Sequence, residues 1–70
     1  MTIALDDRVE WDWGRGTASG RVTEIHAERT TRTIKGTKVV RNGTADNPAV
    51  VIRQDDGGTV LKSASELRQV

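Results

Sequence analysis

The stretch VEWDWGRGTASGRV, from Val9 to Val22, holds the features that decide the fold. Its first part alternates strictly between apolar and polar residues, so that Val9, Trp11 and Trp13 share one side of an extended chain. Such alternation is typical of a strand with one face in the core and the other in solvent. Three glycines follow between positions 14 and 20, and they predict a loop over this segment.

The sequence on both sides of this loop also favours strands. Residues 21–34 are rich in Val, Ile and Thr, which are common in strands. Val22 and Ile25 are out of phase by one residue, which predicts a bulge or a sharp bend of the kind that curls a sheet. Residues 49–54 and 59–63 form two short apolar strands on either side of the turn sequence DDGG.

The remaining signals mark turns and the end of the domain. Asn42-Gly43 and Asn47-Pro48 predict breaks in the chain. Ser63 and Glu66 have the spacing of a capping box, which predicts a single 3₁₀ turn near the C-terminus. In 70 residues, four or five short strands indicate an all-β fold, and we expect a small five-stranded barrel because closure removes exposed edges.

The predicted domain covers residues 6–70 and follows a short N-terminal tail, residues 1–5. Its core is expected to contain the apolar residues on the inner side of the strands: Val9, Trp11, Val22, Ile25, Val39, Val51 or its neighbours Val50 and Ile52, Leu61 and Leu67. Because the chain has no Phe or Tyr, two tryptophans would supply much of the buried area.

Composition excludes several classes of chemistry. The chain has no cysteine, and His26 is its one histidine, so neither a disulfide nor the usual metal-ligand spacing is available. The adjacent carboxylates Asp6-Asp7 and Asp55-Asp56 lie in terminal or turn segments, where no cleft is expected to raise a carboxyl pKa. We therefore predict no enzyme activity, no cofactor and no metal. Met1–Leu5 is too short for a signal segment or a membrane span, so no membrane association and a cytoplasmic location are expected.

The two tryptophans are the first candidates for ligand binding. Trp11 and Trp13 share the face of Val9, so both rings are expected to pack in the core. The alternative is that one ring is exposed at the mouth of the barrel and stacks on a ligand. Trp13 is then the better candidate, because it borders the glycine segment.

A basic strip is the second candidate. Residues 29–41 carry five basic side chains and no acid, whereas the rest of the chain carries six basic and ten acidic residues. The five recur every third position: Arg29, Arg32, Lys35, Lys38 and Arg41. A spacing of three places successive strand residues on opposite faces, although a turn near Lys35-Gly36 would let some converge. The strip is either a ridge that contacts phosphates or a solvated hairpin whose charges protect a strand edge.

Several separated blocks resemble one known family. These are RVEWDWG (8–14), TASGRV (17–22), TTRTIKGTKVVRN (30–42), DNPAVVI (46–52) and DDGGTVLKSASEL (55–67), and together they span Asp6 to about Arg68. They are similar to the hypervirulence-associated tudor-like domain family. The resemblance implies an SH3-like, tudor-type barrel, found in small bacterial proteins, and brings no known ligand. Readers of methylated side chains use a cage of several rings, which Trp11 and Trp13 alone do not form.

Three functions follow as hypotheses. The first is a non-catalytic tudor-like binding module whose ligand, a protein or peptide or a nucleic acid, the sequence does not decide. The second is a nucleic-acid-binding barrel that uses the basic strip for phosphates, together with Trp13 for stacking; its binding should depend steeply on salt. The third is a structural or assembly protein that forms a homo-oligomer, in which the long second strand or its hairpin pairs with another copy.

Overall fold

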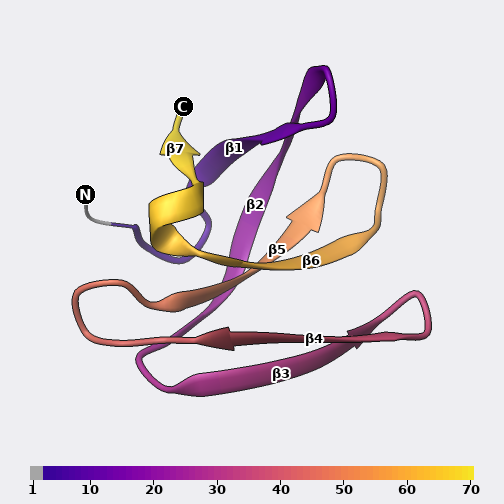
Figure 1. The fold of residues 1–70 in the computed structure, drawn as a ribbon. Coiled ribbons are helices and arrows are strands. Elements are labelled where there is room, and N and C mark those ends of the chain that lie inside the picture. The colour runs from indigo at the N-terminus through magenta and orange to yellow at the C-terminus, as the bar shows by residue number, and fades with distance from the viewer. Residues whose placement is uncertain (1–2) are drawn as a thin grey trace.

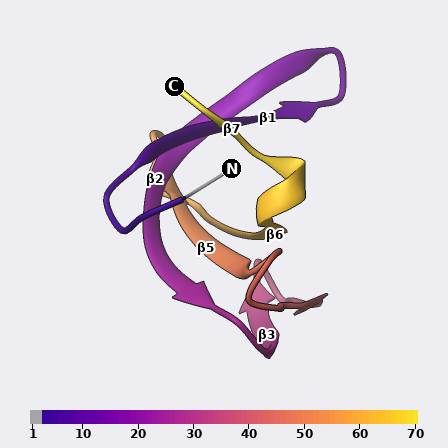
Figure 2. The same ribbon diagram turned by 90° about the vertical axis from the view of Figure 1, so that its left-hand side faces the viewer.

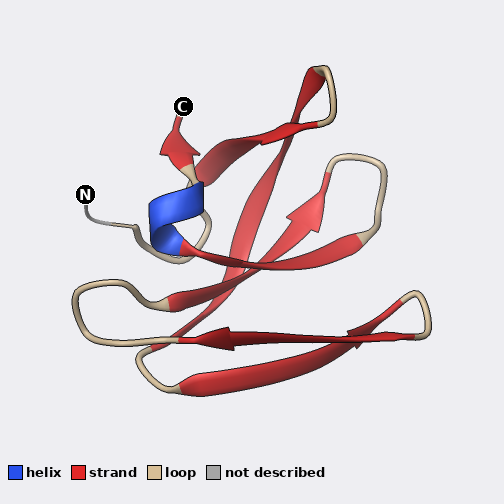
Figure 3. Cartoon of the chain, in the orientation of Figure 1, coloured by secondary structure: helices blue, strands red, loops and turns tan. Residues whose placement is uncertain are grey.

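The computed structural model describes residues 3–70, and it shows an all-β chain with one short 3₁₀ turn (Figures 1 and 3). The elements in chain order are β1 (Arg8–Trp13), β2 (Gly16–His26), β3 (Arg29–Ile34), β4 (Thr37–Asn42), β5 (Ala49–Gln54), β6 (Thr59–Ser63), the 3₁₀ turn (Ala64–Glu66) and β7 (Arg68–Gln69). The predicted all-β class and the predicted 3₁₀ turn are confirmed.

The described strands form two antiparallel sheets. The main sheet has the order β6-β5-β2-β1-β7, and β3 and β4 form a separate two-stranded sheet that packs against β6. The two sheets are not closed into a barrel, so the predicted five-stranded barrel is not observed. The strand count was wrong because residues 21–34 contribute to two strands and because β7 adds a short edge strand beside β1.

Strand β2 is the curved element that connects the upper and lower parts of the molecule (Figure 2). Its register against β5 shifts between Val22 and Glu24, which confirms the bulge predicted from the phase of the apolar residues. Beyond His26 the chain bends through Ala27 and Glu28 before β3 starts. The bulge and the bend together carry the chain from the main sheet into the second sheet.

The glycine segment corrects the prediction of a loop over residues 14–20. Only Gly14 and Arg15 form the turn, and β2 already begins at Gly16. Gly20 lies inside the strand, and the position requires glycine because a Cβ there would stand 2.3 Å from the carbonyl oxygen of Arg53 on β5. Here glycine permits a close approach of two strands rather than a flexible loop.

The core has two parts, one on the inner face of the main sheet and one between β5, β6 and the second sheet. One cluster of buried residues contains Val9, Trp11, Val22, Val50, Ile52, Ala64 and Leu67. A second contains Ala49, Val51 and Leu61, and Ile34 and Val39 of the second sheet pack against it. The predicted core is largely confirmed, although Ile25 and Val39 are only partly buried.

The segment after β4 fixes the base of the second sheet. Gly43 donates its N–H to the carbonyl of Glu28 at 3.1 Å, and a Cβ on Gly43 would lie 2.3 Å from the carbonyl oxygen of His26. The predicted break at Asn42-Gly43 is confirmed, because β4 ends at Asn42, and Gly43 marks a point where two chain segments cross closely.

The two ends of the described chain also pack on the main sheet. Ile3 contacts the larger core cluster, although it belongs to the segment predicted as a tail, of which residues 1–2 lie outside the described part. The single helical segment among residues 3–70 is the 3₁₀ turn, so none of these residues forms a helix that is long enough to cross a bilayer.

Candidate functional site: an open groove beside Trp13

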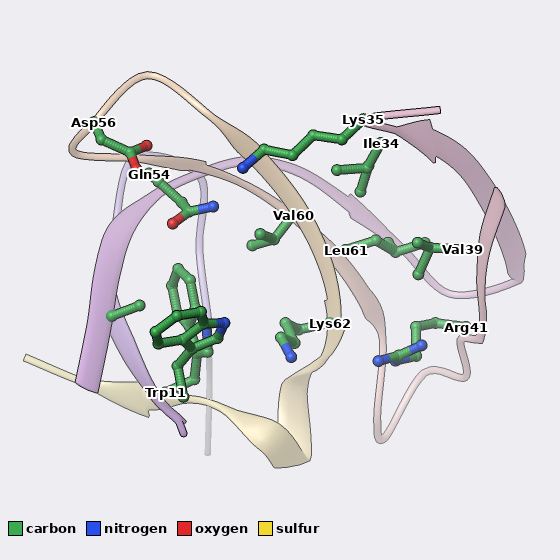
Figure 4. Close-up of a pocket in the computed structure, with 12 residues that line it drawn as sticks. Trp11, Ile34, Lys35, Val39, Arg41, Gln54, Asp56, Val60, Leu61 and Lys62 are labelled. Carbon is green, nitrogen blue, oxygen red and sulfur yellow. The ribbon is translucent and has the colours of Figure 1, made fainter. Parts of the chain in front are cut away.

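A groove of about 610 Å³ runs between the three hairpins of the molecule (Figure 4). The β1–β2 and β3–β4 hairpins form its two sides, and the β5–β6 hairpin contributes residues between them. Its lining is mainly apolar, with charged groups around it: Trp11, Trp13, Ala18, Ile34, Lys35, Val39, Arg41, Gln54, Asp56, Val60, Leu61 and Lys62.

The two tryptophans occupy different environments. Trp11 is 2% exposed and belongs to the core, whereas Trp13 is 73% exposed. The expectation that both rings pack inside is therefore wrong for Trp13, and the alternative of an exposed Trp13 is confirmed. The reason lies in the register, since Trp13 pairs with Gly16 as the last pair before the turn. The Trp13 side chain is on the same face of β1 as Val9 and Trp11, but it is too close to the turn for core residues to cover it.

The basic strip is divided between the two faces of the second sheet. The register pairs Thr33 with Lys38 and Arg29 with Asn42, which places Arg29 and Lys38 on the face away from Val39. Both of these side chains are exposed and form no ion pair among residues 3–70. Because β3 and β4 are both extended, the spacing of three does not produce one continuous ridge.

Two arginines of the strip point back toward the molecule and are paired with acids. Arg32 Nη2 lies 2.6 Å from Oε1 of Glu24. The same oxygen lies 2.8 Å from Nε2 of His26. Arg41 Nε lies 2.8 Å from Oε1 of Glu66. These contacts fasten the second sheet to β2 and to the 3₁₀ turn, so the first role of the two arginines is structural.

The cations at the groove differ in their freedom to bind a ligand. Arg41 and Lys62 share the carboxylate of Glu66, with Lys62 Nζ at 3.6 Å. Lys35 has no ion-pair partner in the part of the chain that the structure describes, and Figure 4 shows its side chain extending over the groove. Lys35 is thus the groove cation that is available to an incoming group.

The backbone at Lys35 is unusual for a lysine. Its φ is +50° and that of Gly36 is +78°, so both central residues of this two-residue turn are left-handed. This is the requirement of a type I′ turn, where Asn, Asp or Gly is normally preferred at the first position. Lys35 therefore occupies a turn position that favours other residues, and its side chain lines the groove.

The structure also adds groove residues that were not predicted from the sequence. Gln54, Asp56, Val60 and Lys62 come from the β5–β6 hairpin. The sequence did indicate this hairpin through its DDGG turn, which is confirmed between β5 and β6. However, no local pattern shows that its tip lies near Lys35, because their proximity depends on how the two sheets pack.

Outside the groove, the remaining titratable groups form ion pairs or lie at the surface. The hydrogen bonds from His26 and from Arg32 hold the pKa of Glu24 below its usual value. Asp55 is paired with Arg8, and the Arg8 and Ser19 hydrogen bonds lower the pKa of its carboxyl. No group of three or more potential ligand side chains within residues 3–70 is arranged to hold a metal ion.

The comparison with protein families gives one match, which covers nearly the whole chain. The model of the hypervirulence associated proteins TUDOR domain matches residues 6–67. The chain belongs to this family, as the sequence blocks suggested. Neither the comparison with curated proteins nor the comparison with solved structures gave a match.

Proposed function

We propose that this chain is a non-catalytic, tudor-like binding module that holds a peptide segment in the groove beside Trp13. The observation that carries the proposal is an indole that is 73% exposed next to an apolar groove of about 610 Å³. A large exposed aromatic ring is costly to leave in water and is common at the centre of protein interfaces. In the bound state, an apolar side chain of the peptide packs on Trp13 and on Val60.

The composition of the groove supports a peptide over a nucleic acid. A strand of nucleic acid needs a track of free cations and aromatic platforms. Here Arg41 and Lys62 already share Glu66, and Asp56 adds a negative charge at the same groove. Lys35 is left to pair with one acidic group or one carbonyl of the ligand. The pattern of one exposed ring, apolar walls and one free cation suits a short peptide segment.

Selection from a random peptide library tests this proposal. Short random peptides displayed on phage would be selected on the folded protein, with the Trp13→Ala variant used to remove non-specific binders. The selected peptides are then titrated into ¹⁵N-labelled protein, and the indole N–H signals of Trp11 and Trp13 are followed separately. We expect the Trp13 signal to shift and that of the buried Trp11 to move little. Peptides that bind Trp13→Ala equally well would contradict the proposal.

Two other outcomes would assign a different function. Oligo-dT that shifts Trp13 and Lys35 at low salt, and loses its effect at physiological salt, would make the groove a nucleic-acid site. A mass in solution that rises with concentration, and that Trp13→Ala abolishes, would make it a self-association surface. The bacterial source and the cytoplasmic location remain predictions from the sequence.

A further inference from the structure

Three arginines form a row across the main sheet, on the face opposite the larger core cluster. Arg8 on β1 is the register partner of Arg21 on β2, and Arg21 is in turn the register partner of Arg53 on β5. All three side chains are exposed. Directly opposed residues of an antiparallel sheet have Cβ atoms about 4.5–5.5 Å apart and point to the same side. The three guanidinium groups therefore share one patch of surface, here named the arginine row.

The arginine row has too few acids to balance it. Asp55 accepts two hydrogen bonds from Arg8, at 3.1 and 2.6 Å, and a third from the hydroxyl of Ser19 at 2.9 Å. The side chain of Arg21 donates only to the backbone carbonyl of Asp6 at 3.3 Å, and Arg53 forms no side-chain hydrogen bond or ion pair with any residue from 3 to 70. Of the three arginines, Arg8 alone forms an ion pair within residues 3–70.

Folding alone does not explain this arrangement. Like charges at directly opposed positions of a sheet destabilise it. Charged residues often protect the free edge of a sheet from aggregation, but β2 and β5 are interior strands with a hydrogen-bonded neighbour on each side. Arg21 and Arg53 therefore guard no edge. An anion bound between them would remove the repulsion that the folded chain otherwise keeps.

We propose that the arginine row binds a phosphate group, with Arg21 and Arg53 as its two direct donors. Guanidinium groups present paired N–H donors in a planar fork that matches the oxygens of phosphate, and one multiply charged group can accept from two such forks. Arg8 is compensated by its ion pair with Asp55, so the uncompensated positive charge of the row lies on Arg21 and Arg53. The ligand class is a small phosphate-bearing molecule, such as a phosphate monoester or a pyrophosphate.

This site is independent of the groove. Arg8 and Arg21 alternate along their strands with Val9 and Val22, which point into the core, so the arginine row lies on the outer face. Trp13 shares the parity of Val9 and Trp11 and belongs to the other side of β1. A peptide in the groove and a phosphate on the arginine row would therefore contact different surfaces, and either one can exist without the other.

A titration with sodium pyrophosphate tests the proposal. Sodium chloride keeps the ionic strength constant while the Nε–H signals of the arginines are followed in the ¹⁵N-labelled protein. We expect the largest shifts at Arg21 and Arg53, with no shift of the Trp13 indole. Each of Arg21→Gln and Arg53→Gln should weaken binding about tenfold or more, since each removes a charge-assisted pair of hydrogen bonds. Inorganic phosphate, titrated in parallel, shows whether one phosphate group is enough.

The matched control is Arg29→Gln, which removes an exposed and unpaired arginine from the second sheet. It should leave pyrophosphate binding unchanged. The variant Arg21→Gln/Arg53→Gln is expected to fold, because it relieves repulsion, and the buried Trp11 indole signal reports whether it does. Absence of shifts at constant ionic strength, or equal shifts in this double variant and in Arg29→Gln, would overturn the proposal.

Discussion

The Nε of Arg41 donates a hydrogen bond of 2.8 Å to Oε1 of Glu66, and this contact joins the second sheet to the 3₁₀ turn at the end of β6. The same carboxylate oxygen accepts the backbone N–H of Ser63 at 3.0 Å. Glu66 therefore caps the turn and links the two sheets at once. Burial raises the pKa of its carboxyl, but the hydrogen bonds from Arg41 and Ser63 outweigh this effect, and the pKa is lowered.

The substitution Glu66→Ala should lower the free energy of unfolding by about 1–2 kcal/mol, because it removes both the cap and a partly exposed ion pair. Glu66→Gln should cost less, since the amide oxygen still accepts from Ser63. Urea denaturation measures both. A double-mutant cycle with Arg41→Ala gives the coupling between the two side chains. An equal loss from Arg41→Ala with and without Glu66 would show that the bond contributes nothing.

Truncation of the two tryptophans should change the free energy of unfolding by very different amounts. Trp11→Ala should cost about 3–5 kcal/mol and leave this small domain largely unfolded, whereas Trp13→Ala should change stability by no more than about 0.5 kcal/mol. Fluorescence separates them without such damage. In Trp11→Phe the remaining Trp13 should emit at long wavelength and be quenched by iodide. In Trp13→Phe the remaining Trp11 should be shielded, and equal quenching of the two variants would be inconsistent with the structure.

Two glycines of β2 provide a matched pair. Gly20→Ala should destabilise the fold by about 2–3 kcal/mol, since the new methyl group would force β2 away from the backbone of Arg53. Gly16→Ala meets only the carbonyl oxygen of Trp13, at 3.9 Å, and should be neutral or stabilising by up to about 1 kcal/mol. Thermal unfolding of the two variants checks the order, and a Gly20→Ala variant as stable as Gly16→Ala would contradict it.

At the turn between β3 and β4, Lys35→Asn should raise stability by up to about 1 kcal/mol, because asparagine tolerates the left-handed backbone better than lysine. If Lys35 serves the groove, the same variant should bind the selected peptides more weakly. Denaturation and peptide titration are measured on one sample. A variant that is more stable and binds unchanged would remove Lys35 from the proposed binding site.

Stability should fall in acid through three carboxylates. The pKa of Glu24 is lowered by hydrogen bonds from His26 and then Arg32, that of Asp55 by Arg8 and then Ser19, and Glu66 is also shifted down. The unfolded chain therefore binds protons first as the pH decreases. The stabilisation is complete well above the ordinary carboxyl pKa of about 4, and should be lost as the pH falls through that value toward the lower pKa values of the folded state. Urea midpoints between neutral and acidic pH measure the loss, and a flat profile would contradict these pairings.

The sequence predicted what depends on local pattern. Alternation gave β1, the phase change at Val22 gave the bulge, and Ser63 with Glu66 gave the 3₁₀ turn. Contacts between distant segments were not visible: Arg32 meets an acid eight positions away, and Arg41 one that is twenty-five positions away. Because these two acids pair with Arg32 and Arg41, the basic strip does not act as one continuous surface.

The glycine segment and the arginine row escaped the sequence for related reasons. Glycine signals a loop and a close strand contact equally well, and only the partner strand decides between them, as it does at Gly20. The arginine row needs the register of three strands, and the register of β5 depends on the bulge in β2. The residue pattern of a single strand shows neither which strand approaches Gly20 nor which residues of neighbouring strands are paired.

The separation of the two sheets has a mechanical consequence for the groove. Its sides belong to two hydrogen-bond ladders that share no backbone pairing, and the smaller ladder is anchored at its base where Gly43 crosses His26 and Glu28. Beyond this crossing, the contacts that hold the β3–β4 hairpin to the main sheet and the 3₁₀ turn include the ion pairs Arg32–Glu24 and Arg41–Glu66 and the packing of Ile34 and Val39. The spacing of the two sides of the groove therefore rests on side-chain contacts rather than on a shared hydrogen-bond ladder.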